Sequence, residues 1–212
     1  MSIICPTVTC QSEDLHEYRT QMELVENLAS RIQVDLMDGE FAPTKSPDID
    51  KIWFPEGIQI DLHLMYQHPA DVLNDVLELK PNMLIVHKEA HVDIATLSGA
   101  LRASDIKLGL AILPETPVSD CLDELEFVDH VLIFSGDLGH YGGKADLNLL
   151  NKIDQLKKYK PGLEVGWDGG VNETDVKQLA EGGVDVLNVG GFIQNSDDPV
   201  AAYKQLSNLL QS

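Results

Sequence analysis

The stretch from Arg31 to Pro43, RIQVDLMDGEFAP, is typical of a buried strand that runs into a turn. Within it, Asp35 lies between a valine and a leucine, so a carboxylate takes the place of another aliphatic side chain. An unpaired charge is strongly unfavourable in such surroundings, so Asp35 needs a partner. The stretch therefore predicts a strand that carries a polar site into an apolar core.

Two later strands carry polar residues in a similar way. The segment QIDLHLM (59–65) places His63 among apolar residues, and LEVGWDGGV (163–171) places Asp168 before two glycines. We expect Asp35, His63 and Asp168 to meet at one mouth of one barrel, since the C-terminal strand ends of a parallel barrel share a face. Two carboxylates and an imidazole suit either a divalent-metal site or an acid/base pair, and the residues alone leave both open.

Short apolar strands alternate with amphipathic segments along the whole chain. The expected strands are 3–8, 32–37, 58–65, 83–87, 108–112, 131–134, 163–167 and 186–189, and the expected helices are 15–29, 69–79, 94–103, 118–125, 147–158, 173–181 and 199–210. Eight parallel strands with helical crossovers predict an α/β fold, a single (β/α)8 TIM barrel. A doubly wound open sheet is the alternative, but no GxGxxG follows the first strand.

Length and composition fit one large folded unit. The chain has 212 residues, so we predict one barrel domain over 1–212. With 43% hydrophobic and 24% charged residues, and no apolar run near the roughly 20 residues that cross a bilayer, no membrane segment is expected. The first residues, MSIICPTVTC, lack the features of a signal peptide, and we expect a cytoplasmic protein.

Charge and cysteine spacing narrow the possible partners. The chain has 15 Lys and Arg against 35 Asp and Glu, and the formal charge of −20 argues against nucleic acid and anionic lipid. A phosphate site would have to rely on backbone N–H groups and helix dipoles. Cys5, Cys10 and Cys121 show no CxxC spacing, which argues against disulfides and structural zinc. A homo-oligomer is a further expectation.

Three glycine pairs follow strands whose ends share the predicted site face. Gly169–Gly170 and Gly190–Gly191 end the seventh and eighth strands, where barrels of this class often hold a phosphate. Gly142–Gly143 lies in a glycine-rich loop, 136–144, whose sequence is compatible with closure over a ligand and also with a surface turn that has no role. The pairs therefore predict a phosphate site, because glycine permits an approach that a Cβ would block.

Five segments in this order resemble the ribulose-phosphate 3-epimerase family over nearly the whole chain. They are VDLMDGEFAP, DLHLM followed by a helix that begins with proline, LAILPETPV, EVGWDGGVN and NVGGFIQNSDDP. The resemblance implies a metal-dependent 3-epimerisation of a ketose phosphate, D-ribulose 5-phosphate and D-xylulose 5-phosphate, through an enediolate. It also implies a small sugar phosphate as the partner and a divalent metal (zinc, iron, manganese or cobalt) as the cofactor.

The family's functional residues carry over by motif. Asp35 and Asp168 would be the acid/base pair, and both would bind the metal together with His63. Thr7 falls where the family has a substrate-contacting serine, and Met37 and Met65 match methionines that line the reaction site. The glycines that follow the strands are the other candidate substrate contacts (Gly142, Gly143, Gly169, Gly170, Gly190 and Gly191).

One departure from the family affects the metal site. Gln33 stands where the family has a fourth metal ligand, a histidine, and glutamine is a weaker, neutral oxygen donor, so a more weakly held ion is expected. Two alternatives follow, namely an epimerase of another ketose phosphate or a non-catalytic sugar-phosphate binder. Related decarboxylase and synthase barrels carry a lysine at the mouth of the second strand, where this chain has Leu36 and Met37.

Overall fold

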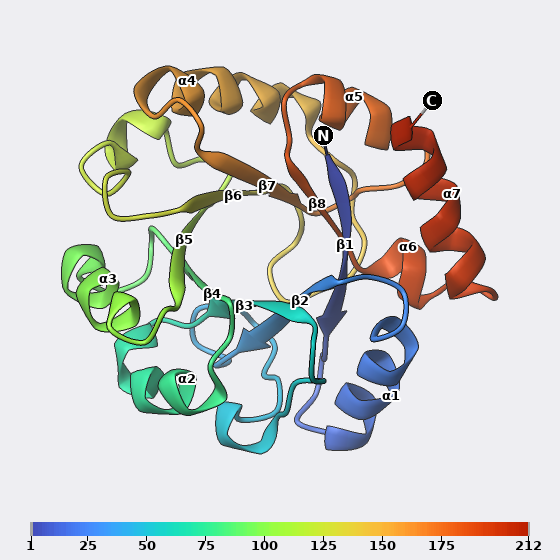
Figure 1. Cartoon of the computed structure of the whole chain (residues 1–212), viewed down its shortest axis with the longest axis horizontal. Helices are drawn as coiled ribbons and strands as arrows, with labels where there is room; N and C mark the ends of the chain where they lie inside the picture. The colour runs from blue at the N-terminus through green and yellow to red at the C-terminus, as the bar shows by residue number, and fades with distance from the viewer. Residues whose placement is uncertain (1, 212) are drawn as a thin grey trace.

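A closed barrel of eight parallel strands forms the centre of the molecule, and helices surround it (Figure 1). The computed structural model describes residues 2–211, so residues 1 and 212 of the predicted domain lie outside the described part. The strands pair in chain order, and β8 closes the ring against β1. The predicted (β/α)8 TIM barrel is therefore confirmed, and the open doubly wound sheet is excluded.

The strands follow the apolar runs of the sequence closely. They are β1 (Ile3–Thr9), β2 (Arg31–Met37), β3 (Gln59–Met65), β4 (Met83–His87), β5 (Lys107–Ile112), β6 (His130–Phe134), β7 (Glu164–Asp168) and β8 (Val186–Val189). Each end falls within one residue of the range expected from the sequence. Apolar runs of this length are therefore sufficient to locate the strands of a barrel that is buried on both faces.

Successive side chains of each strand point alternately toward the helices and into the barrel, so an outer core and an inner core lie on opposite faces of the sheet. On β2, Ile32, Val34 and Leu36 pack in the large apolar cluster shared with the helices. Gln33 and Asp35 lie on the opposite face of the strand, toward the barrel interior, because successive side chains of a strand point to opposite faces. The polar residues of β2 are thus confined to the inner face, which is where the site forms.

The outer layer contains both α-helices and short 3-10 helices. The α-helices are α1 (Leu15–Val25), α2 (Leu73–Leu79), α3 (Ile94–Arg102), α4 (Asn151–Tyr159), α5 (Val176–Glu181), α6 (Gly191–Gln194) and α7 (Pro199–Gln211). The 3-10 helices are η1 (Ile49–Lys51), η2 (Pro69–Val72), η3 (Val118–Cys121) and η4 (Leu147–Leu150). Pro69 begins η2, which leads into α2 as one helical connection.

The predicted helix at 118–125 is wrong. The segment forms only η3 and then a series of turns, in which the Leu125 N–H donates to the carbonyls of Cys121 and Leu122. Its residues include Ser119, Asp120 and Cys121, which are weak helix formers. Two helix boundaries also differ clearly, since α1 ends four residues before the predicted 29 and α5 begins at 176 and not at 173. The short helix α6 is an element that the sequence does not predict.

An ion network closes the barrel at the N-terminal ends of the strands. The Arg31 guanidinium donates two hydrogen bonds to the Glu164 carboxylate, at 2.9 and 2.8 Å, and one to Asp61 at 2.7 Å. His130 Nδ1 lies 2.7 Å from Glu164 Oε2. The partners hold the pKa of Glu164 well below its usual range. This end of the barrel is therefore filled by paired charges, and the open end lies opposite.

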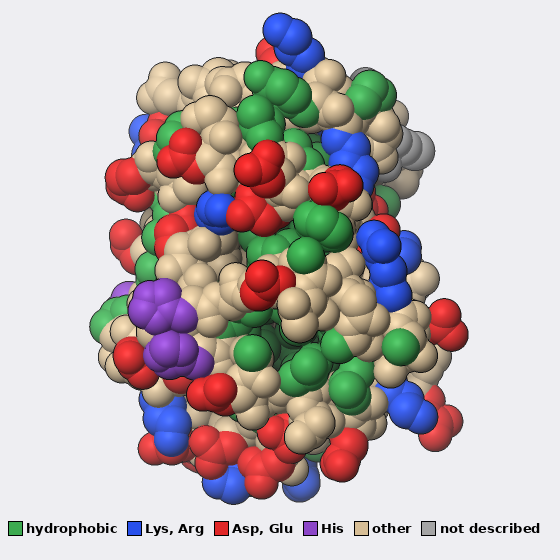
Figure 2. Space-filling model, turned by 90° about the vertical axis from the view of Figure 1, so that its left-hand side faces the viewer, with side chains coloured by type: hydrophobic (Ala, Val, Ile, Leu, Met, Phe, Trp, Pro, Cys, Tyr) green, Lys and Arg blue, Asp and Glu red, His purple; other side chains and the backbone are tan. Residues whose placement is uncertain are grey.

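The exterior of the barrel agrees with the composition. Figure 2 shows acidic side chains spread over one face of the molecule among Lys and Arg side chains. Cys5, Cys10 and Cys121 are buried, free thiols. Within residues 2–211, every helix is too short or too polar to cross a bilayer.

Candidate active site

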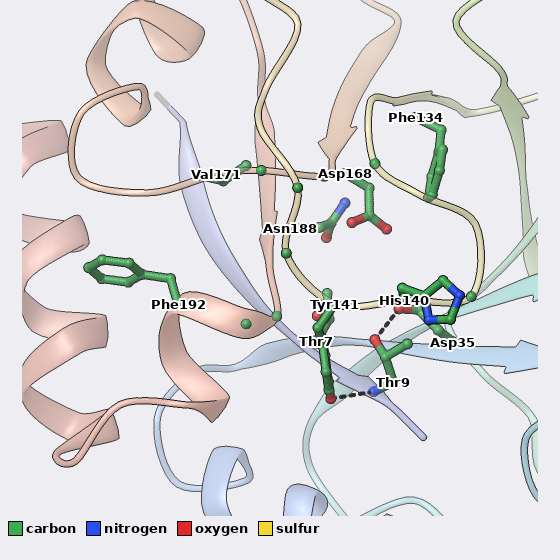
Figure 3. A pocket seen from close by; sticks show the side chains of 18 of the residues that line it. Thr7, Thr9, Asp35, Phe134, His140, Tyr141, Asp168, Val171, Asn188 and Phe192 are labelled. Carbon is green, nitrogen blue, oxygen red and sulfur yellow. Dashed lines mark hydrogen bonds between the residues drawn. The ribbon is translucent and has the colours of Figure 1, made fainter. Parts of the chain in front are cut away.

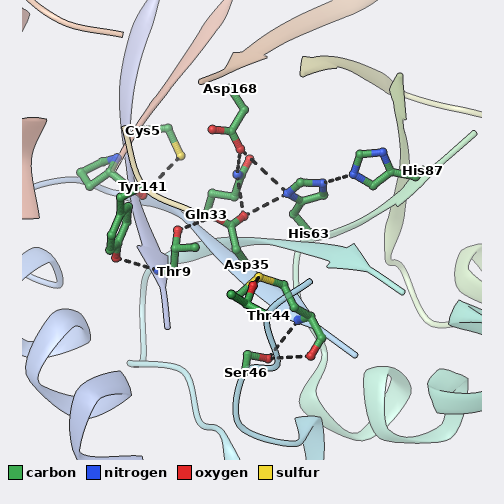
Figure 4. Close-up of polar contacts among 12 residues, drawn as sticks. Cys5, Thr9, Gln33, Asp35, Thr44, Ser46, His63, His87, Tyr141 and Asp168 are labelled. Carbon is green, nitrogen blue, oxygen red and sulfur yellow. Dashed lines mark hydrogen bonds and ion pairs between the residues drawn. The ribbon is translucent and has the colours of Figure 1, made fainter. Parts of the chain in front are cut away.

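The inner faces of β2, β3 and β7 bring two carboxylates and an imidazole together at the C-terminal mouth of the barrel. Asp35 pairs in register with His63, and each of Asp35, His63 and Asp168 offers a ligand atom within 4.8 Å of the others. His63 Nδ1 lies 3.0 Å from Asp35 Oδ1 and 3.9 Å from Asp168 Oδ2 (Figure 4). The structure therefore places the three residues together as the sequence predicts.

Gln33 lies between the two carboxylates, one inward position below Asp35 on the same strand. Its Nε2 donates to Asp35 Oδ1 at 2.8 Å and to Asp168 Oδ2 at 2.6 Å (Figure 4). Its Oε1 is buried and has no hydrogen-bond partner. Gln33 thus satisfies the carboxylates with its amide protons and leaves its own oxygen unpaired, which is an unfavourable arrangement for a buried amide.

The donor set fits a divalent cation. Ligand atoms about 2 Å from one tetrahedral ion lie about 3.3 Å apart, and the two distances from His63 Nδ1 fall on either side of that value. A 180° rotation of the Gln33 amide would turn the unpaired Oε1 toward Asp35 and Asp168, which a cation between these groups would make favourable. Asp35, His63 and Asp168 would then hold the ion, with Gln33 as a neutral oxygen donor.

The two carboxylates have different surroundings. Asp35 accepts hydrogen bonds from the Thr9 hydroxyl, at 2.5 Å, and from the Gln33 amide. Asp168 keeps 14% of its side chain exposed, and burial together with the nearby charge of Asp35 raises its pKa well above the ordinary range of an aspartate. Asp168 therefore holds a proton more readily than an isolated aspartate would.

His87 lies behind His63, on the neighbouring strand β4. The two Nε2 atoms are 2.9 Å apart, and both side chains are fully buried. Burial lowers the pKa of His87 to about 4, so this ring is neutral at physiological pH. The rings of Phe41 and Phe134 pack against His87, with centroids 4.7 and 5.9 Å away. His87 therefore contacts the site without reaching the cavity.

A cavity opens directly above Asp35 and Asp168, as Figure 3 shows. Of the residues expected to contact substrate, it is lined by Thr7, Met65, Gly142, Gly143, Gly169, Gly170, Gly190 and Gly191. Met37 does not line it, because its sulfur packs against the Thr44 hydroxyl and its side chain clusters with Ala42. The predicted substrate contact of Met37 stays a prediction, and this methionine packs in a small cluster with Met65, which does line the cavity.

The glycine pairs serve two different purposes. Gly142 and Gly143 have positive φ angles of 92° and 83° and face open space, so their backbone is accessible to a ligand. A Cβ at Gly169 would lie 2.2 Å from the Gly136 nitrogen, and one at Gly170 would lie 2.1 Å from the Ala145 nitrogen. The pair after β7 therefore also lets this turn pack against both ends of the 136–144 loop.

Tyr141 holds that loop against the barrel. Its hydroxyl donates to Gln21 Oε1 on α1 and accepts from the Thr9 N–H, at 2.9 Å, on β1 (Figure 3). The aromatic ring also lies against Gly190, where a Cβ would come within 2.8 Å of it. The loop is thus held beside the cavity by contacts with β1, α1 and Gly190, and its closure over a ligand stays a prediction.

Sequence reasoning did not single out several residues that line the cavity. Thr9 follows Thr7 by two residues on one strand and so shares its face, and this spacing would have predicted that Thr9 also lines the cavity. Asn188 is a lone polar residue within an apolar strand, is in register with Asp168, and has a buried Oδ1 without a partner. Tyr141 gave no such signal, because its contacts depend on how the loop folds back.

Comparison with known proteins agrees with this geometry. A family model described as the ribulose-phosphate 3 epimerase family matches residues 4–194. The chain belongs to this family. The ribulose-phosphate 3-epimerase of Mycobacterium tuberculosis is 30% identical over 187 residues, covering 85% of this chain and 82% of that protein. The enzyme of that name from Helicobacter pylori is 29% identical over 209 residues, covering 95% of each chain.

Solved structures extend the likeness of the fold. The 3-hexulose-6-phosphate synthase of Salmonella typhimurium superposes with a TM-score of 0.69, covers 99% of this chain and 98% of its own, and is 16% identical. At that identity the likeness concerns the barrel alone. Family membership, in contrast, confirms the resemblance carried by the five sequence motifs and makes the chain a member of an isomerase family.

Proposed function

We propose that this protein is a cation-dependent epimerase that interconverts D-ribulose 5-phosphate and D-xylulose 5-phosphate. The observation that carries the proposal is the placement of Asp35 and Asp168 with His63 at the floor of a cavity that accessible glycines line. Family membership supports a pentose phosphate as the substrate class. With a formal charge of −20, the phosphate must be held by local backbone donors, and the 142–143 and 190–191 segments are our candidates.

In the proposed reaction, one aspartate removes the C3 proton and the other returns a proton to the opposite face of the planar enediolate. Asp168, with its raised pKa, suits the acid, and Asp35, which accepts hydrogen bonds from Thr9 and Gln33, suits the base. A bound divalent cation would supply electrostatic stabilisation of the negative charge on the substrate oxygens. After one passage the two carboxylates have exchanged protonation states, which is the starting arrangement for the reverse reaction.

The surroundings of the carboxylates favour this chemistry. Thr9 and Gln33 orient Asp35, while Phe134 and the loop held by Tyr141 limit the access of water to the cavity. The cation fits the three ligands and the Gln33 oxygen, and we propose zinc, iron, manganese or cobalt without choosing among them. A cytoplasmic location and a homo-oligomer stay predictions from the sequence.

The test is incorporation of solvent deuterium at C3 of ribulose 5-phosphate, with and without an added divalent cation. We expect cation-dependent labelling by the wild type and a loss of at least about 100-fold in Asp35→Asn and in Asp168→Asn, since each removes one proton-transfer group. Asp185→Asn, at the opposite end of the barrel, is the control and should label normally. Near-normal labelling in either active-site variant would refute the mechanism.

The same experiment separates the alternatives. Labelling of another ketose phosphate, with none in ribulose 5-phosphate, would identify an epimerase of different specificity. Tight binding of a sugar phosphate without labelling, under every cation tried, would favour a non-catalytic binder. The observation that favours a non-catalytic binder is the pair of hydrogen bonds that Gln33 donates to the two carboxylates, which holds them together without a cation.

A further inference from the structure

A line of buried polar groups runs from the carboxylate cluster to the loop after β4. His63 Nδ1 faces Asp35 Oδ1 at 3.0 Å, and His63 Nε2 faces His87 Nε2 at 2.9 Å. The other nitrogen of His87, Nδ1, lies 3.5 Å from Glu89 Oε2. Neither of these last two atoms has a hydrogen-bond partner, although both are buried. His87 Nδ1 and Glu89 Oε2 therefore face each other.

Glu89 is fixed in place from the opposite side. Its Oε1 accepts hydrogen bonds from the Leu113 N–H, at 3.0 Å, and from the Thr116 hydroxyl, both in the loop after β5. Because this oxygen is occupied by two donors, Oε2 is the one that is turned to His87. The Glu89 side chain is 23% exposed, and the His87 ring is fully buried under Phe41. The contact between Glu89 and His87 is thus fixed by the hydrogen bonds to Glu89 on one side and by the packing of the His87 ring on the other.

When a cation occupies the position between His63 Nδ1 and the carboxylates, so that Nδ1 does not donate to Asp35, proton counting along this line gives one assignment. An ionised carboxylate only accepts hydrogen bonds, so Glu89 requires the proton of His87 to be on Nδ1. Nε2 of the neutral His87 ring is then an acceptor and requires a proton on His63 Nε2. The nitrogen of His63 that is left to bind a cation is Nδ1, and this atom is the one that faces Asp35 and Asp168.

We propose that Glu89 and His87 are positioning residues that fix the tautomer of His63, and that they thereby raise the affinity of the Asp35–His63–Asp168 cluster for a divalent cation. The inference rests on the cation site of the proposed function, but not on the epimerase activity. Groups that orient a metal-bound histidine in this way commonly change metal affinity by about 10- to 100-fold when they are replaced.

The variant Glu89→Gln should reverse the direction of the hydrogen bond between His87 and His63. The two donors from Leu113 and Thr116 keep the carbonyl oxygen of the new amide at the anchor, so its NH2 group faces His87 Nδ1. The proton of His87 then moves to Nε2, and His63 is left with a proton on Nδ1, where the cation binds. The substitution keeps the size of the side chain and changes only its hydrogen-bonding character.

The control is Glu124→Gln. Glu124 is also a partly buried carboxylate, with 21% of its side chain exposed, and it pairs with Lys88 and not with a histidine. Glu124→Gln removes the same charge as Glu89→Gln, so a general electrostatic effect on cation binding would appear in both variants. A second test variant, His87→Leu, removes the acceptor for His63 Nε2 and places an apolar side chain next to Phe41 and Phe134.

The experiment measures Co²⁺ affinity by competition with a chelator, without substrate, on variants shown to be folded by thermal denaturation. We expect Glu89→Gln and His87→Leu to bind Co²⁺ about 10- to 100-fold more weakly than the wild type, and Glu124→Gln to stay within about twofold. Adding Glu89→Gln to His87→Leu should cause no further loss, since the ring that transmits the effect is absent.

Nitrogen-15 NMR of labelled histidines supplies the second readout, which a merely structural role would not move. His87 should carry its proton on Nδ1 in the wild type and on Nε2 in Glu89→Gln. Unchanged Co²⁺ affinity in the folded variants, the same His87 tautomer in both proteins, an equal loss in Glu124→Gln, or a wild type without measurable Co²⁺ binding would each overturn the proposal. A failure of the epimerase assay alone would leave these results standing.

Discussion

Replacing Gln33 by methionine tests how the buried carboxylate pair is stabilised when no cation is bound. Methionine is unbranched and similar in length, so it fills the position without offering a hydrogen bond. The wild-type amide donates to Asp35 at 2.8 Å and to Asp168 at 2.6 Å. The variant loses both contacts, and the two carboxylates face each other without a donor between them.

The expected loss of stability follows from three contributions. Hydrogen bonds to a charged group contribute about 1.5–3 kcal/mol each, and the variant loses two of them. It also removes the buried, unpaired Gln33 Oε1, whose presence costs about 1–3 kcal/mol in the wild type. The net decrease in the free energy of unfolding at pH 8 is therefore about 2–3 kcal/mol from the middle of these ranges.

The decrease should depend on pH in a definite direction. The raised pKa of Asp168 means that its ionised form is unfavourable in the fold, so its contribution to stability falls as the pH rises through the folded-state pKa. Gln33 opposes this loss because its amide supports the ionised pair. At pH 5, below the raised pKa of Asp168, the charge of this side chain is reduced and it needs the Gln33 amide less, so the difference between wild type and Gln33→Met should fall below about 1 kcal/mol.

Urea unfolding in the presence of a chelator, followed by tryptophan fluorescence, measures the effect. Trp167 is buried on β7 beside Asp168, so its emission reports on this part of the barrel. Gln59→Met, at an exposed glutamine at the start of β3, controls for the change of residue type. Equal stabilities of wild type and Gln33→Met across the pH range, or a larger loss at pH 5 than at pH 8, would refute the reasoning.

Three further predictions concern other parts of the molecule. Gly190→Ala brings a Cβ within 2.8 Å of the Tyr141 ring, so steady-state kinetics should show a KM for the sugar phosphate raised at least about tenfold, with kcat less affected. Tyr141→Phe removes the hydroxyl that contacts the Thr9 N–H, and limited proteolysis should cut the 136–144 loop faster than in the wild type. Glu164→Gln weakens the pair with Arg31, so urea unfolding should show the variant to be about 1–2 kcal/mol less stable than the wild type at pH 7. Because the pKa of Glu164 is depressed in the fold, wild-type stability falls as the pH drops below about 5. The stability of the variant should change less with acid.

Strand positions and the main polar cluster were predictable from the sequence. Asp35, His63 and Asp168 interrupt apolar runs at matching strand ends, and a parallel barrel brings such ends to one face. The connection 118–125 was not predictable in this way, because a periodic pattern over so few residues does not distinguish a helix from turns. Local patterns therefore located the site, and they failed where tertiary packing decides a short connection.

Contacts between distant segments explain the rest of what the sequence did not reveal. Gln33 was expected as a metal ligand, and its bridging of two carboxylates depends on Asp168, which lies 135 residues later. The role of Tyr141 depends on Thr9 in the same way. Neither residue has a characteristic neighbour in the chain, so only the folded arrangement shows what each contacts.

The ion network at the closed end of the barrel ties β2 to β7 beneath the carboxylate cluster. Arg31 and Asp35 lie on β2, Glu164 and Asp168 lie on β7, and each pair is separated by four residues, or about 13 Å along a strand. The Arg31–Glu164 bridge thus spans the barrel directly below the two aspartates and ties together two strands that are not neighbours in the sheet. The Arg31–Glu164 contact therefore helps to fix the spacing of the two strands that carry Asp35 and Asp168, and no residue of the loops at the mouth takes part in it.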